Sequence, residues 1–154
     1  MKEIIEIFKA CLTPTIAIIT TYIAYQQWKT NRIKLRMDLY EKRLRIYKEV
    51  HKLLAIVIRN AKIEQNEFND FIVNTSEADF LFDTEVTDFI SEIYKHALHL
   101  QRWIAEYRDY TEPPKEGYNH KEVSDGEHSE LQWLTNQFEP AKKVFKKYIN
   151  LKQN

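Results

Sequence analysis

The sequence is poor in glycine and proline, with two glycines and four prolines among 154 residues. The tight turns of β-sandwiches, dinucleotide-binding folds and phosphate-binding loops depend on these residues, so such folds are nearly excluded. A single cysteine, Cys11, rules out an intrachain disulfide and a Cys-rich zinc site, and fits a reducing compartment. The 23 Lys and Arg balance the 23 Asp and Glu, so a charged partner has to meet a local patch. We therefore expect an all-α protein.

The longest uncharged stretch, residues 10–28, lies near the N-terminus between Lys9 and Lys29. As a helix it would be about 28 Å long, close to the hydrocarbon thickness of a bilayer. Several threonines and two glutamines make it only moderately hydrophobic. We predict a transmembrane helix in an anchor of residues 1–28, which continues into the long first helix of a cytoplasmic bundle, residues 29–154. The alternative is a helix buried in a bundle that does not enter a membrane.

Charge and aromatic residues predict the orientation of this helix. Tyr22, Tyr25 and Trp28 lie at its downstream end, as in an interfacial aromatic belt. Eight basic residues crowd the next twenty positions, whereas only two precede the span. The positive-inside rule therefore predicts a single-pass protein of the inner membrane with most of the chain in the cytoplasm. The basic residues expected to lie at the membrane surface are Lys29, Arg32, Lys34 and Arg36.

The predicted span has two different faces. Leu12, Ile16, Ile19 and Ile23 form an apolar stripe at helical spacing. The other face carries small and polar side chains, which either are merely tolerated in an anchor or allow close helix packing and a pore. These residues are Thr13, Ala17, Thr20, Thr21, Ala24 and Gln27.

Helical periodicity continues through the rest of the chain. Residues 15–61 contain no glycine or proline and have two apolar rows, which predicts one long helix buried in a bundle. A short helix with a break near residues 74–76, a helix from Asp83 or Thr84 to Tyr110, and a last helix capped by Ser129 should follow. Pro140 is expected to bend or restart that helix. The segment from Thr111 to His128 contains both glycines and is predicted to be a loop.

Charge is segregated along the sequence. Between Glu64 and Glu92 there are nine acidic residues and no basic one, whereas the segments after the span and at the C-terminus are lysine- and arginine-rich. We expect the acidic middle to pair with basic helices of the same chain or of a neighbouring copy.

Histidines offer the only candidates for chemistry. Arg45 and His51 have the R-x5-H spacing of a metal-independent ribonuclease, in which His transfers protons and Arg neutralises phosphate. On one ideal helix the two side chains are about 240° apart, so one helix alone does not form a site. His51 lies in an apolar row, where a lone histidine is more often a core residue hydrogen-bonded to a neighbour. His96 and His99 are three residues apart, as in a pair that binds Zn²⁺, but we expect one on the apolar and the other on the polar face of the helix, so that they diverge. His120, Asp125 and His128 are a still weaker candidate for a metal site. We predict no metal and no cofactor.

Several segments carry a similarity to known proteins, namely residues 25–28, 35–43, 46–47, 80–82, 90–97 and 133–151. In these segments the sequence resembles a group of small bacterial membrane-anchored helical proteins. The layout also resembles the membrane accessory protein of type VI-B CRISPR systems, with a membrane helix followed by a divergent HEPN-like domain. That resemblance implies an oligomeric membrane pore in antiphage defence, with self, the lipid bilayer and a CRISPR effector or other defence protein as partners. Arg45 and His51 match the HEPN spacing, but Ile46 replaces the usual polar residue.

Three functional hypotheses follow from these patterns. The first is a membrane-embedded homo-oligomer that permeabilises the membrane and is not an enzyme. The second is a membrane-tethered HEPN-type ribonuclease, in which a dimer brings two copies of Arg45 and His51 together and RNA is the substrate. The third is a scaffold that holds a cytosolic partner at the membrane through the segment from Thr111 to His128.

Overall fold

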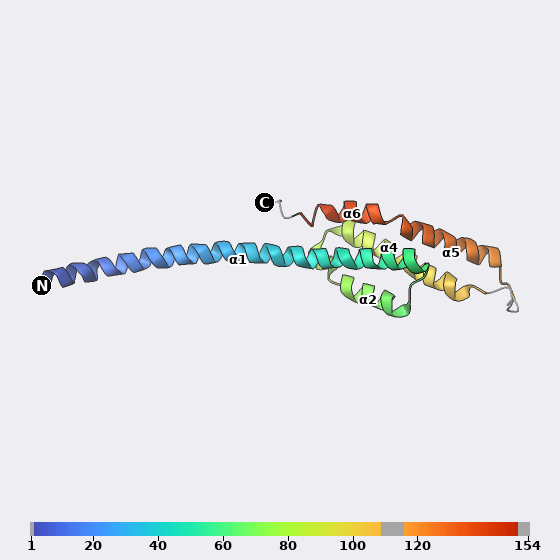
Figure 1. Ribbon diagram of the computed structural model, residues 1–154, viewed down its shortest axis with the longest axis horizontal. Coiled ribbons are helices and arrows are strands. Elements are labelled where there is room, and N and C mark those ends of the chain that lie inside the picture. Colours follow the sequence, from blue (N-terminus) through green and yellow to red (C-terminus); the bar gives the residue numbers. More distant parts are fainter. Residues whose placement is uncertain (1, 109–115, 151–154) are drawn as a thin grey trace. The chain divides into compact units, whose positions relative to one another are not determined.

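The computed structural model describes the backbone of residues 2–108 and 116–150, and their side chains except those of residues 2–5, 7–11 and 13. All regular structure in these ranges is helical, which confirms the predicted fold class at this level. The chain divides into two compact units, Met1–Leu39 and Tyr40–Asn154. Each unit is described separately below. The helices are α1 (Lys2–Asn60), α2 (Gln65–Thr75), α3 (Ala78–Leu81), α4 (Thr84–Glu106), α5 (His120–Thr135) and α6 (Phe138–Lys146) (Figure 1).

Within the first unit the chain is one uninterrupted stretch of α1, with Pro14 inside the helix. Every side chain from Pro14 to Leu39 is exposed. Large apolar side chains are exposed along the whole stretch, among them Ile18 (71%), Ile19 (52%) and Trp28 (54%). The helix here is therefore not held by packing within the described chain. Its own backbone hydrogen bonds are what support it.

The second unit is a helical bundle around the last part of α1. Ile46, Val50, Leu54 and Val57 are buried, whereas Ile58 is exposed. They share one core with side chains of the other helices, so the long helix is buried here as predicted. The buried partners from α2 to α6 include Phe68, Phe71, Ile90, Ile93, Leu100, Leu134 and Phe145.

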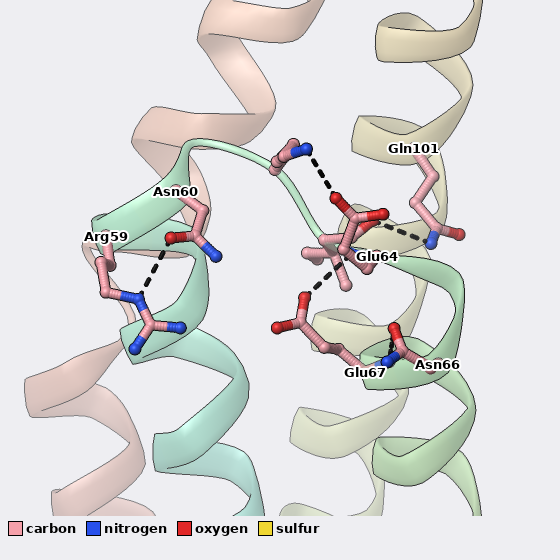
Figure 2. A network of polar contacts seen from close by, with 8 residues as sticks. Arg59, Asn60, Glu64, Asn66, Glu67 and Gln101 are labelled. Atoms are coloured by element: carbon pink, nitrogen blue, oxygen red, sulfur yellow. Dashed lines mark hydrogen bonds and ion pairs between the residues drawn. The ribbon is translucent and has the colours of Figure 1, made fainter.

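A tight corner ends α1 and starts α2 (Figure 2). Ala61 has a positive φ of 52°, a left-handed conformation that usually favours glycine. Glu64 and Glu67 then form a reciprocal capping box, in which the Glu64 backbone N–H donates to Oε2 of Glu67 at 2.9 Å. From α4, the amide Nε2 of Gln101 donates to the carbonyl of Ile63 at 3.2 Å and fixes this corner to the bundle (Figure 2).

The predicted element borders are partly right. The break after Thr75, the start of α4 after Asp83 and the restart of the last helix near Pro140 are confirmed. Pro140 stands in the first turn of α6, where its missing N–H leaves no hydrogen bond broken. The prediction of a loop as far as His128 is wrong, because α5 already begins at His120.

One local contact and one contact between helices accompany this early start of α5. The side chain of Asn119, and not that of Ser129, caps the helix by accepting a hydrogen bond from the Glu122 N–H at 3.3 Å. Gly126 stands inside the helix, where an added Cβ would lie 2.5 Å from Cε2 of Trp103 on α4. This glycine therefore permits close helix packing, whereas the sequence suggested a turn. Residues 111–115 of the predicted loop lie outside the described residues.

Candidate functional site

The exposed stretch of α1 holds the largest group of candidate residues. Because residues 10–28 are one regular helix, the spacing of Ala17, Thr20, Thr21 and Ala24 does place them on one stripe. All four side chains are exposed, as is that of Gln27. The side chain of Thr13 lies outside the described residues. Among residues whose side chains are described, no helix reaches the length and hydropathy of a membrane-crossing segment.

The threonine hydroxyls of this stripe are bonded within their own helix. Oγ1 of Thr20 donates to the carbonyl of Ile16 at 2.9 Å, with Ala17 O also within 3.0 Å. Oγ1 of Thr21 donates to the carbonyl of Ala17 at 2.8 Å. Such bonds satisfy a hydroxyl donor without water. The two threonines are therefore less polar toward their surroundings than the sequence alone suggests.

Aromatic and basic side chains interact directly at the downstream end of the span. The rings of Tyr25 and Trp28 stack at 6.0 Å between centroids, and the guanidinium of Arg32 lies 4.8 Å from the Trp28 ring centroid. Nε2 of Gln26 donates to the hydroxyl of Tyr22 at 2.9 Å. Lys29, Lys34 and Arg36 are also exposed. Along the helix, a group of aromatic side chains is therefore followed by a group of basic ones. Rings with one polar edge next to cations are typical of the interface between lipid and water.

In the structure, Arg45 and His51 contact different residues. Nη2 of the exposed Arg45 forms a 3.0 Å ion pair with Oε2 of Glu77, just before α3. The half-buried ring of His51 instead lies between Tyr47, at 4.3 Å between centroids, and Phe138 of α6, at 5.1 Å. Within one chain the two side chains therefore have different partners, and no site formed by both is present among the described residues.

His51 lies in an environment that disfavours its charged form. Its Nε2 is buried and has no hydrogen-bond partner among the described residues. Burial lowers the pKa of His51 below its ordinary value of 6.5. The negative charge of Glu139 raises this pKa, and the positive charge of Lys142 lowers it slightly further, but burial has the largest effect. The ring is therefore neutral near pH 7, as a buried core histidine would be.

A second histidine group joins α4 to α5, and the sequence analysis missed it. Nδ1 of His96 lies 2.5 Å from Oε2 of Glu130, and Nδ1 of His99 lies 3.5 Å from Oε1 of the same carboxylate. The ring of His96 stacks on Trp133 at 3.6 Å between centroids. The prediction that the two histidines diverge is therefore wrong, because one acid from α5 meets both. Spacing within α4 gave no sign of Glu130, which is 31 residues after His99.

The described residues contain no group of three or more His, Cys, Asp or Glu side chains arranged to hold a metal ion. His96, His99 and Glu130 are therefore not such a group. Their contacts are hydrogen bonds and ion pairs. His120, which was grouped with Asp125 and His128, instead lies 3.2 Å from the hydroxyl of Tyr118 through its Nδ1.

Comparisons with family models, with curated proteins and with solved structures found no match for this chain. The resemblance to membrane-anchored accessory proteins of CRISPR systems therefore remains a hypothesis from the sequence.

Proposed function

We propose that this protein is a membrane-embedded homo-oligomer whose N-terminal helix enters the inner membrane, with most of the chain on the cytoplasmic side. The proposal depends mainly on one observation. Every side chain from Pro14 to Leu39 is exposed, although many of them are large and apolar. A contiguous exposed apolar surface of this kind is typical of a membrane or protein contact. The aromatic and basic band from Tyr22 to Arg36 supports lipid as the first of these contacts.

Residues 10–28 are only moderately hydrophobic, and under this proposal two features reduce the free-energy cost of placing them in lipid. Thr20 and Thr21 satisfy their hydroxyl groups within the helix, which lowers the free energy needed to bring them into lipid. Ala17 and Ala24 leave space for a neighbouring helix, so copies of the stripe can pack against each other and away from lipid. Self-association is therefore part of the proposal, and a permeabilising role in antiphage defence follows from the family resemblance.

Vesicle experiments test both parts. Full-length protein added to vesicles with anionic lipid should float with them, resist extraction at high pH and release an enclosed dye. Thr20→Leu with Thr21→Leu should retain flotation and reduce dye release severalfold, because the stripe loses its small and polar side chains. Ile16→Leu with Ile23→Leu is the matched control on the apolar stripe and should leave release unchanged. Protein that stays in the aqueous phase would contradict membrane insertion, and flotation without release would contradict the pore.

A HEPN-type ribonuclease is the second candidate function. The buried, unpartnered Nε2 of His51, with its lowered pKa, is the observation that favours it, because a neutral imidazole accepts a proton. The Arg45–Glu77 ion pair argues against it, since a catalytic guanidinium has to meet phosphate. RNA cleavage that His51→Ala abolishes would support this function. An Ala variant with full biological effect would exclude it.

A further inference from the structure

Phe80 is the most exposed of the large apolar side chains found in the described residues, at 88%. It belongs to the short helix α3. Ser76 and Glu77 keep helical dihedral angles between α2 and α3, so Val73, 69% exposed, stands seven residues before Phe80 on the same side. Together these two side chains make an apolar projection on the surface of the bundle.

Charged side chains of both signs lie near this projection, because Nε of Arg43 donates to the Leu81 carbonyl at 3.0 Å, while Glu77 and Asp79 stand just before Phe80. Phe80 lies in the stretch from Glu64 to Glu92, which contains nine acidic residues and no basic one. Glu77 is engaged by Arg45. The exposed Asp79, next to Phe80, has no ion pair among the residues that the structure describes. A partner for this surface should therefore offer an apolar depression with positive charge around it.

A surface groove with that chemistry lies on α6. It has a volume of about 760 Å³, and Pro140 and Val144 provide its apolar lining. Lys142, Lys143 and Lys146 line it together with Glu85 and Glu139. These two carboxylates already have partners, Lys147 and Lys142 respectively, so unpaired positive charge remains at the groove. The groove is open because Ala141 and Phe145 turn the apolar side of α6 into the core and leave the lysines outside. In the described part of the chain, Lys143 and Lys146 have no ion pair, and Lys142 is 3.8 Å from Glu139.

The projection and the groove lie at the same end of the bundle. Phe82, two residues after Phe80, packs its ring against Phe145 and Tyr148 at 5.2 and 5.4 Å. The hydroxyl of Tyr148 donates to Asp83 at 2.8 Å. Phe80 is nevertheless absent from the groove lining, so the two features do not meet within one copy.

We infer that the α6 groove of one copy receives Phe80 of the next copy. Asp79 would then face Lys143 and Lys146 across the contact, and two different surfaces would meet. Such a head-to-tail contact repeats from copy to copy and gives a closed ring when the rotation closes. This inference rests on the self-association in the proposed function and identifies the surfaces that make it, but it needs no pore.

Zero-length cross-linking tests which surfaces meet. Unlabelled and ¹⁵N-labelled full-length protein are mixed in the detergent used for extraction, or in plain buffer if none is needed. A carbodiimide then joins carboxylates to lysines. Cross-linked peptides that pair Asp79 of one isotope with Lys143 or Lys146 of the other arise only between copies. We expect these pairs and a ladder of species beyond the dimer. Absence of the mixed pairs, or a ladder that ends at the dimer, would overturn the head-to-tail contact.

Variants test the contribution of each surface. Phe80→Ala should weaken association by roughly tenfold or more in sedimentation experiments, because one large apolar side chain is lost from the contact. At concentrations too low for association its melting temperature should stay unchanged, since the side chain is exposed in the single copy. Asp79→Lys should weaken association, and adding Lys143→Glu to it should restore the wild-type level. Asp125→Lys, the same charge change on the exposed side of α5, is the control. Unchanged association of the Phe80 variant would overturn the inference.

Vesicle flotation in parallel separates this inference from the proposed function. Protein that forms the cross-linked ladder but does not float would support this contact and contradict membrane insertion. Protein that floats without the Asp79 cross-links would support membrane insertion and contradict this contact.

Discussion

The two parts of α1 have the same secondary structure and opposite environments. From Pro14 to Leu39 every side chain is exposed, whereas from Tyr40 onward the helix contributes Ile46, Val50, Leu53 and Val57 to a closed core. Both parts carry apolar side chains at helical spacing. The second part shares its core with apolar side chains of α2, α4 and α6. An apolar periodicity therefore indicates that a face will be covered, but it does not indicate by what.

The largest expected effect comes from a matched pair of substitutions in these two parts. Ile46→Ala should lower the free energy of unfolding by about 2–5 kcal/mol, because Ile46 is fully buried and its loss leaves a cavity. Ile19→Ala, at a site 52% exposed, should change it by about 0.5 kcal/mol or less. Urea unfolding followed by tryptophan fluorescence measures both. Equal losses would mean that residues 14–39 are packed as tightly as the core.

A close helix contact in the second unit should give the next largest effect. Gly126→Ala gains helix propensity of about 1 kcal/mol, but the added Cβ would meet the ring of Trp103, and such overpacking costs about 1–3 kcal/mol. We expect a net loss of stability of about 1 kcal/mol in thermal unfolding. Ser124→Ala, exposed on the same helix, is the control and should not destabilise. A more stable Gly126 variant would contradict the close packing of α4 and α5.

The histidine group between α4 and α5 is expected to contribute on a similar scale. Glu130→Gln keeps the side-chain shape but loses the carboxylate that meets both His96 and His99, with an expected cost of about 1–3 kcal/mol. Chemical denaturation measures this. Asp125→Asn, five residues earlier and exposed, should have almost no effect. If both variants behave alike, the Glu130 contacts contribute nothing to stability.

A smaller effect should appear as a pH dependence at His51. Its pKa in the folded protein is lowered by burial, with smaller opposing and supporting effects from Glu139 and Lys142 of α6. Below pH 6.5 the unfolded chain therefore binds a proton at this ring more readily than the folded chain does, and stability falls as the pH falls. His51→Leu should remove this loss. As the pH is lowered from 8 to 5, the free energy of unfolding of the variant should therefore increase relative to that of the wild type. A constant difference across that range would contradict the lowered pKa.

The smallest effect is expected at the Arg45–Glu77 pair. Both side chains are about half exposed, so Arg45→Ala should cost about 1 kcal/mol or less. A double-mutant cycle with Glu77→Ala measures the coupling. A variant of normal stability that loses its biological effect would show that Arg45 acts outside this pair, as the ribonuclease hypothesis requires.

Periodicity and capping residues predicted most of the helices, because both act within a few residues of sequence. Asp83 and Pro140 mark helix starts for local reasons. The start of α5 was missed because Gly126 was interpreted by its turn-forming tendency, whereas its position depends on Trp103, more than twenty residues away. The His96–Glu130 contact and the exposure of Phe80 also depend on how distant helices meet. No local pattern encodes such contacts.

The distribution of the three tryptophans gives the molecule built-in optical reporters. Trp28 stands among exposed residues of α1, Trp103 contacts Gly126, and Trp133 stacks on His96. Variants that retain one indole at a time would give separate emission signals for the N-terminal stretch, for the α4–α5 contact and for the imidazole stack. A blue shift confined to Trp28 on adding lipid would then locate the apolar environment without any attached label.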